Sequence, residues 1–216
     1  MTAQKLPESA YRLTSHELLA LLAFEKGAGT ALTRRVLALA DLPDHHDLVR
    51  AGVGTLNVRD TATVNGEQVA LRGPAIYLAR VFSTANLWFD ITRVGPDAVA
   101  PIYIASSPAG RVVLFLRPLS EYVCLPLDEG TSTLEMVEAT VNDAVAAAGE
   151  RSGGIVTSRR YDGDSAPAVA NIKMLKDGSI KLAAAPLDAT GQLTVRDLGA
   201  GEQPGAAVRA LLAVSA

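Results

Sequence analysis

Three kinds of side chain in this 216-residue sequence could carry catalysis or bind a metal: the histidines, two paired aspartates and the single cysteine. His45 and His46 lie between aspartates, but neighbouring residues on a helix project about 100° apart and rarely bind one ion together. The Asp-Gly-Asp at 162–164 resembles the start of a calcium loop, yet the place of its bidentate glutamate falls near Met174. Cys124 lies in a predicted strand, where a small buried thiol is the usual case. We therefore predict no catalytic residue, no metal site and no cofactor.

The glycine-containing segments do not match a phosphate-binding loop. Gly52-x-Gly54 lacks a third glycine, and the segment 27–30 contains no lysine of the P-loop type. No serine lies in a Gly-x-Ser-x-Gly turn. These absences leave binding, without chemistry, as the function that the sequence favours.

Helical patterns dominate the first 85 residues. A short strand at 11–13 leads to a helix that is capped by Thr14 or Ser15 and ends at 27–29. Further helices are predicted from Thr30 to about Asp41, from Asp44 through Arg50 with a stop at Gly52, and from Pro74 to about Thr84. Between the last two, the stretch 56–71 alternates around Asn65-Gly66, which indicates a hairpin because this dipeptide accepts positive φ at both turn positions.

From Asn86 onward the pattern changes to strands separated by glycine and proline. Strands are predicted at Leu87–Val94, Ala100–Ser106, Arg111–Arg117 and Tyr122–Leu127, then a helix at 132–148. The plan repeats with strands at Ile155–Tyr161, Ala168–Leu175, Ile180–Ala184 and Leu193–Val195 and a helix that opens at 204–205. The offset of about 68 residues indicates a structural duplication, although two unrelated meanders would give the same order.

The predicted fold class is therefore α+β: antiparallel sheet(s) from two ββββα units related by a pseudo-twofold axis, with the N-terminal helices packed on the sheet. We expect a helical part with a small hairpin at 1–85, the first meander and helix at 86–150, and the second at 151–216. We expect these parts to pack as one compact domain.

The two strand sets differ in the faces that they predict. In the second set, one face is dry and one wet: Ile172, Met174, Ile180, Leu182, Leu193 and Val195 against Asn171, Lys173, Lys181, Gln192 and Arg196. In the first set, Leu114 and its neighbours would line one side, and Trp88, Tyr103, Val113 and Phe115 the other. A sheet that is apolar on both sides must be covered on both, either by the chain's own helices or in part by a partner.

Composition excludes several function classes. The net charge is −3 and the pI is near 5.6, which argues against a protein that binds nucleic acid by neutralising phosphates. No apolar run reaches the ~18 residues that a membrane span needs, and the N-terminus has no apolar signal region. We expect a cytoplasmic globular protein that binds neither nucleic acid nor membrane.

Several short motifs, in order, resemble the EspG-like chaperones of type VII (ESX) secretion. They are Leu13-Thr14-x-x-Glu17-Leu18, the helix end at 48–52, the polar hairpin, Leu78-Ala79-Arg80, and the meander that ends at 123–127 before a helix. The Ala-, Val-, Arg-, Gly- and Asp-rich composition also resembles the product of a high-GC actinobacterial genome. The resemblance implies a cytosolic, non-enzymatic chaperone that shields the helical tip of a secretion substrate, on a pseudo-twofold antiparallel sheet with flanking helices.

Partner contacts on such a sheet are expected among the aromatic side chains, which are the usual interface anchors. The candidates are Trp88, Tyr103, Phe115 and Tyr122, all expected on the second face of the first strand set, with burial in the core as the alternative for each. Two other functions fit the pattern of elements. One is a winged-helix regulator that uses residues 30–72, with the strands as a sensor; the other is a small-ligand-binding protein with a pocket between the sheets.

Overall fold

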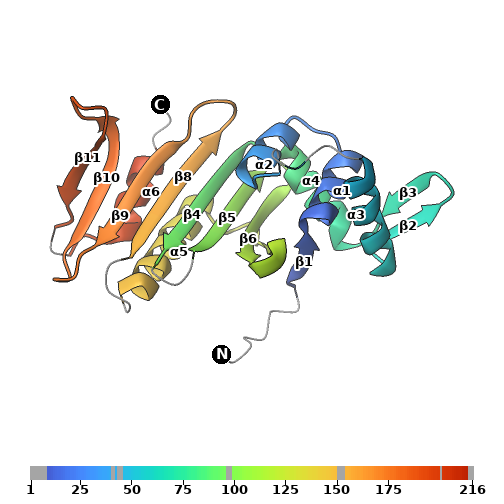
Figure 1. Ribbon diagram of the computed structural model, residues 1–216, viewed down its shortest axis with the longest axis horizontal. Helices are drawn as coiled ribbons and strands as arrows, with labels where there is room; N and C mark the ends of the chain where they lie inside the picture. The colour runs from blue at the N-terminus through green and yellow to red at the C-terminus, as the bar shows by residue number, and fades with distance from the viewer. Residues whose placement is uncertain are drawn as a thin grey trace. The chain divides into compact units, whose positions relative to one another are not determined.

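The structure is a computed structural model of the chain, and it describes residues 9–39, 42, 46–95, 99–149, 154–199 and 201–213 (Figure 1). In chain order its elements are β1 (Tyr11–Thr14), α1 (Ser15–Phe24), α2 (Thr30–Val36), α3 (His46–Val58), β2 (Ala62–Asn65), β3 (Gln68–Leu71), α4 (Pro74–Thr84), β4 (Leu87–Val94), β5 (Val99–Ser107), β6 (Gly110–Arg117), the 3₁₀ turn η1 (Pro118–Ser120), β7 (Glu121–Pro126), α5 (Thr133–Gly149), β8 (Ile155–Asp162), β9 (Ala168–Met174), β10 (Ile180–Leu187), β11 (Leu193–Asp197) and α6 (Pro204–Ala213).

The predicted α+β class and the two ββββα units are confirmed. β4–β7 precede α5, and β8–β11 precede α6. The pairing of β4 with β8 also has the symmetry that a twofold relation requires. Leu87 pairs with Asp162, and Val94 pairs with Ile155. The residues 68 positions after Leu87 and Val94 are Ile155 and Asp162, so each end of β4 pairs with the counterpart of its other end. The duplication is thus visible in the backbone although the side chains do not repeat.

The chain packs into two compact units, and neither unit is one continuous segment as the predicted parts were. Unit 1 contains Met1–Asn86 and Ala105–Glu129, and unit 2 contains Leu87–Ile104 and Gly130–Ala216. Strand β5 therefore gives its first residues to unit 2 and its last residues to unit 1. We describe each unit separately.

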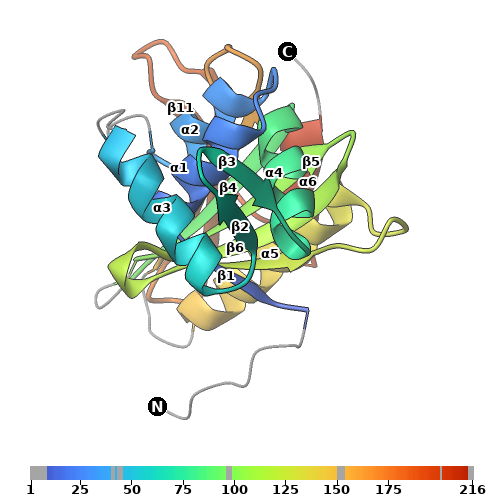
Figure 2. The same ribbon diagram turned by 90° about the vertical axis from the view of Figure 1, so that its right-hand side faces the viewer.

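In the described part of unit 1, helices α1–α4 and the β2–β3 hairpin (Figure 2) accompany strands in the order β1-β7-β6-β5. The β1–β7 and β7–β6 pairs are antiparallel, with Tyr122 of β7 opposite both Leu13 and Leu116. The side chain of Tyr122 reaches the helices, because its hydroxyl donates to the Leu37 carbonyl oxygen at 3.3 Å. The face of the sheet that carries Tyr122 is therefore the face that the helices cover.

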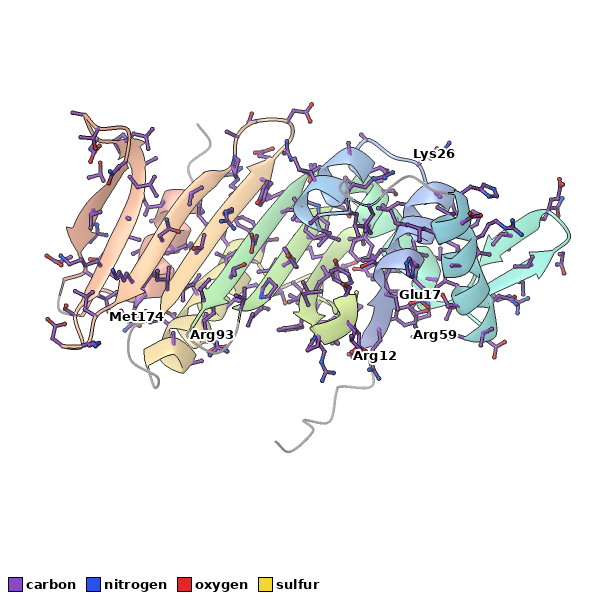
Figure 3. The ribbon with its side chains drawn as sticks, in the orientation of Figure 1. Arg12, Glu17, Lys26, Arg59, Arg93 and Met174 are labelled. Atoms are coloured by element: carbon purple, nitrogen blue, oxygen red, sulfur yellow. The ribbon has the colours of Figure 1, made fainter. Side chains whose placement is uncertain are left out.

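A capping box begins α1. The Thr14 hydroxyl accepts from the Glu17 N–H at 3.2 Å, and the Glu17 carboxylate accepts from the Thr14 N–H at 2.8 Å. Glu17 is 1% exposed and also accepts from Arg59 at 3.0 Å, while the Arg59 guanidinium lies 5.4 Å from the centre of the Tyr11 ring (Figure 3). This ion pair links Arg59, the residue after α3, to the first turn of α1.

Helix α3 differs from its prediction, because it does not stop at Gly52 but continues to Val58. A side chain at Gly52 would place its Cβ 2.1 Å from the His16 carbonyl oxygen, so the glycine permits close contact between α3 and α1. Helix α2 is also shorter than predicted and ends at Val36. The predicted cap at Asp44 lies outside the described residues.

The hairpin predicted around Asn65-Gly66 is confirmed, but the turn lies one residue later than predicted. Gly66 has φ +61°, whereas Asn65 belongs to β2 and pairs with Gln68, so the two central residues of the turn are Gly66 and Glu67. The hairpin pairs Asn65 with Gln68 and Ala62 with Leu71.

Unit 2 has strands in the order β5-β4-β8-β9-β10-β11, and its pairs from β4 to β11 are antiparallel. Helices α5 and α6 pack on one face of this sheet. Arg93 of β4 donates to the Ala147 carbonyl oxygen of α5 at 3.3 Å (Figure 3), and Arg160 of β8 donates to Leu212 of α6 at 2.9 Å. The buried residues Val156, Ile172 and Leu182 lie opposite one another across β8–β10.

The predicted dry face is wrong at β11. Leu182 of the dry face pairs with Arg196, whereas Val195 pairs with Ala183 on the wet face. The register shifts between Ala184 and Leu187, where β10 carries extra residues relative to β11. The mismatched pairs lie in the regular part of the ladder, where Lys181–Ala184 pair with Asp197–Thr194, so the faces of β11 are set by its register with β10, which alternation within β11 alone does not reveal.

Candidate partner-binding surface

The four predicted aromatic contacts fall into two classes of burial. Trp88 is 0% and Tyr122 is 4% exposed, so both belong to the interior of the folded chain. Tyr103 and Phe115 are partly exposed. Only this second pair is accessible to a partner without rearrangement.

The register also separates two of these aromatic side chains. Phe115 pairs with Val123, and Tyr122 pairs with Leu116. Adjacent positions of a strand point to opposite faces of a sheet, so Phe115 and Tyr122 lie on opposite faces. The expectation that all four aromatics share one face is therefore wrong.

A groove in unit 1 offers a different binding surface. Its volume is about 470 Å³, and it is lined by Leu19, Leu22, Ala23, Lys26, Gly27, Thr30, Arg34 and Val49. These residues come from α1, from the α1–α2 connection and from α2 and α3. Figure 3 labels Lys26, which lies in the α1–α2 connection. We call this cavity the α1–α3 groove.

The lining of the α1–α3 groove combines an apolar floor with a cationic rim. Leu19 and Leu22 are nearly inaccessible and form the floor with Val49. Lys26 is exposed and Arg34 is half-buried, and no carboxylate belongs to the described lining. Such a site suits an apolar side chain that carries a carboxylate beside it.

Sequence reasoning did not find this groove. The available signal was the composition of α1. Its four leucines, Leu18, Leu19, Leu21 and Leu22, make the helix apolar around most of its circumference. A helix that is apolar around most of its circumference must be covered on more than one side. The sequence did not show that α2 and α3 would cover the second side incompletely.

A second groove in unit 1 lies at the β5–β6 turn and also measures about 470 Å³. Its lining mixes Arg111 with Asp128 and Glu129, and Tyr77 closes one side by donating to the Arg111 carbonyl oxygen at 3.0 Å. Because the lining carries both signs of charge, it selects no class of partner as clearly as the α1–α3 groove.

The sheet of unit 2 presents a polar face on the side opposite α5 and α6. Lys173 pairs with Lys181 there, and Arg159 binds the buried Asp90 at 2.8 Å. The predicted wet character of β9 and β10 is thus confirmed. A polar face of this kind can remain in water without a partner.

The candidate chemical groups take ordinary structural places. Cys124 is fully buried, and among the described residues no three His, Cys, Asp or Glu side chains are placed to hold a metal ion. His46 is exposed at the start of α3, and His45 lies outside the described residues. In the part of the chain that the structure describes, no helix combines the length and apolarity needed to cross a bilayer.

Burial should make the Cys124 thiol unreactive. Desolvation raises the pKa of this thiol well above its usual range, and the thiolate is the reactive form. We expect dithionitrobenzoate to leave the native protein unlabelled and to label one thiol per chain in denaturant. Rapid labelling of the native protein would show that β7 opens readily.

Neither a family model nor a curated protein matches the sequence. Among solved structures, the chain is similar to the Mycobacterium tuberculosis type VII secretion system chaperone EspG5, solved in complex with the PE25–PPE41 dimer. The TM-score is 0.56 at 11% sequence identity, and the match covers 94% of each chain. The chain therefore has an EspG-like fold.

Proposed function

We propose that this protein is a non-catalytic chaperone of the cytosol that binds a helical secretion substrate and shields its apolar tip. The observation that carries the proposal is the likeness in fold, over 94% of each chain, to a secretion chaperone that was solved with its PE25–PPE41 partner. The burial of Cys124 and the chemistry of the α1–α3 groove are consistent with binding rather than turnover.

The α1–α3 groove is the proposed docking site. An apolar side chain at the end of a partner helix would cover Leu19 and Leu22, and an adjacent carboxylate would face Lys26 and Arg34. Charge complementarity of this kind accelerates encounter and rejects partners of the wrong sign. Tyr103 and Phe115 remain predicted contacts outside the groove.

The test is a capture experiment with the tagged full chain in lysate of the source organism, followed by reconstitution with the purified captured protein. We expect a mainly helical protein, bound in a complex that calorimetry can measure. The double variant Lys26→Glu/Arg34→Glu should weaken this binding by about tenfold or more, because the rim of the groove changes from cationic to anionic.

The matched control is Arg72→Glu/Lys176→Glu, which makes the same change of charge at exposed positions outside the groove. Circular dichroism must show that both double variants are folded. Equal loss of binding in both would mean that net charge, and not the groove, attracts the partner. Failure to capture a helical protein, together with salt-dependent binding of duplex DNA, would instead favour the winged-helix regulator.

A further inference from the structure

Strand β11 ends the sheet of unit 2 with an open edge (Figure 1). The Leu198 N–H donates to the Ile180 carbonyl oxygen at 2.9 Å, and the Gln192 carbonyl oxygen accepts from Asp188 at 2.6 Å. Backbone groups alternate in direction along an antiparallel strand, so even-numbered residues of β11 bond to β10. The N–H and C=O groups of residues 193, 195 and 197 therefore point outward, and no strand among the described residues pairs with them, although the Asp197 carbonyl oxygen accepts from the Arg196 side chain at 3.4 Å.

The internal duplication shows what this edge lacks. The counterpart of β11 in the first meander is β7, the last strand before the helix. β7 is paired with β6 on one side, and on its other side it is covered by β1, with Arg12 opposite Val123. In the second meander, β11 pairs with β10, and the described chain supplies no strand equivalent to β1.

The edge carries some of the usual protection against pairing, but its charges are not free. Natural edges are blocked by free lysines, prolines, bulges or inward charges, and β11 has the register shift beside β10 and Arg196 on the face of Leu182. Here Arg196 donates to both carboxylate oxygens of Glu202, and these hydrogen bonds hold the pKa of the Glu202 carboxyl at about 2. The Asp197 carboxylate lies 3.4 Å from the Lys181 Nζ. The charges are therefore neutralised within the chain, while the apolar side chains of Val195 and Leu187 are 57% and 61% exposed.

A second copy of this strand fits the edge in one register. With Val195 opposite its own copy, Thr194 faces Arg196 and Leu193 faces Asp197, so no like charges meet. This register joins the outward groups of residues 193, 195 and 197, giving about six backbone hydrogen bonds. A shift of two residues in one direction would place Arg196 opposite Arg196, and a shift in the other would lose overlap.

We propose that the protein forms a twofold dimer through antiparallel pairing of β11 with β11 of a second copy. The pair extends the sheet of each copy and covers the exposed Val195 side chains. The inference is independent of the proposed chaperone role, since it uses an edge in unit 2 and not the α1–α3 groove.

Sedimentation equilibrium of the full chain, from micromolar to millimolar concentration, tests the proposal with two variants. Val195→Pro removes an outward N–H without removing a bond to β10, and should raise the dimer dissociation constant by about tenfold or more. Val195→Thr keeps the N–H and the β-branched shape and should leave the constant unchanged within a few fold. A chain that is monomeric throughout, or a dimer insensitive to Val195→Pro, would overturn the proposal.

A cross-link keeps the test decisive if Val195→Pro does not fold. In a hydrogen-bonded antiparallel pair the Cα atoms lie about 5.5 Å apart, within the range of a disulfide. Val195→Cys should therefore yield a covalent dimer on mild oxidation, while Cys124 stays buried. Thr190→Cys, an exposed position in the β10–β11 turn, is the matched control and should not. Equal cross-linking of the two variants, or none at position 195, would contradict the register.

Discussion

Trp88→Ala is expected to destabilise the protein by about 3–5 kcal/mol, because it removes the largest fully buried side chain and leaves a cavity. The cost is a large share of the about 5–15 kcal/mol that stabilises a typical domain. Urea unfolding followed by far-ultraviolet circular dichroism measures it, since this variant has no tryptophan. The midpoint should fall strongly with little change in slope.

Phe115→Ala is the control for this prediction, because Phe115 keeps part of its surface in water. Its loss should be smaller, about 1–2 kcal/mol, in proportion to the smaller area removed from water. The comparison also separates core from contact surface. A stable Trp88→Ala variant that lost its partner would show that Trp88 reaches the surface, contrary to its placement here.

The sequence predicted the strands and helices after residue 86 within a few residues, for a physical reason. Each strand there is bounded by a strong local turn signal, and the turns carry glycines that need positive φ, such as Gly110, Gly163 and Gly178. Helix α5 shows a clear 3.6-residue repeat with Val137 and Val141 buried. Where local geometry decides an element, local sequence is sufficient to predict it.

The errors lie where packing overrides local signals. Gly52 suggests a helix end, but its role is close contact with His16 of another helix. The faces of β11 depend on its register with β10, and the opposite orientation of Phe115 and Tyr122 likewise depends on pairing between strands. No single segment contains this information.

The candidate site could be predicted even less than the fold. Lys26, Arg34 and Val49 come from three separate segments of unit 1, and their combination exists only when α1, α2 and α3 pack together. The sequence offered aromatic side chains instead, and two of those four lie in the interior. Aromatic residues are common in both cores and interfaces, so residue type alone does not distinguish the two.

Gly52→Ala should destabilise unit 1 by about 3 kcal/mol or more, although alanine is the better helix former. The added Cβ would lie 2.1 Å from the His16 carbonyl oxygen and 2.9 Å from the Ala20 side chain. The nearest atoms belong to the backbone of α1, so no rotamer change can relieve the contact. Helices α1 and α3 would have to separate, and the ion pair between Glu17 and Arg59 would be strained with them.

Gly54→Ala provides a matched control in the same helix, since nothing lies within 4 Å of the Cβ that it would add. It should stabilise the protein by about 0.5–1 kcal/mol, because alanine loses less backbone freedom than glycine on folding. Urea unfolding followed by far-ultraviolet circular dichroism, which reports on the helices of unit 1, measures both variants. The two changes are chemically identical and two residues apart, so opposite signs would show that contact with α1 decides the outcome. If Gly52→Ala were also stabilising, the close approach of α1 and α3 would be wrong.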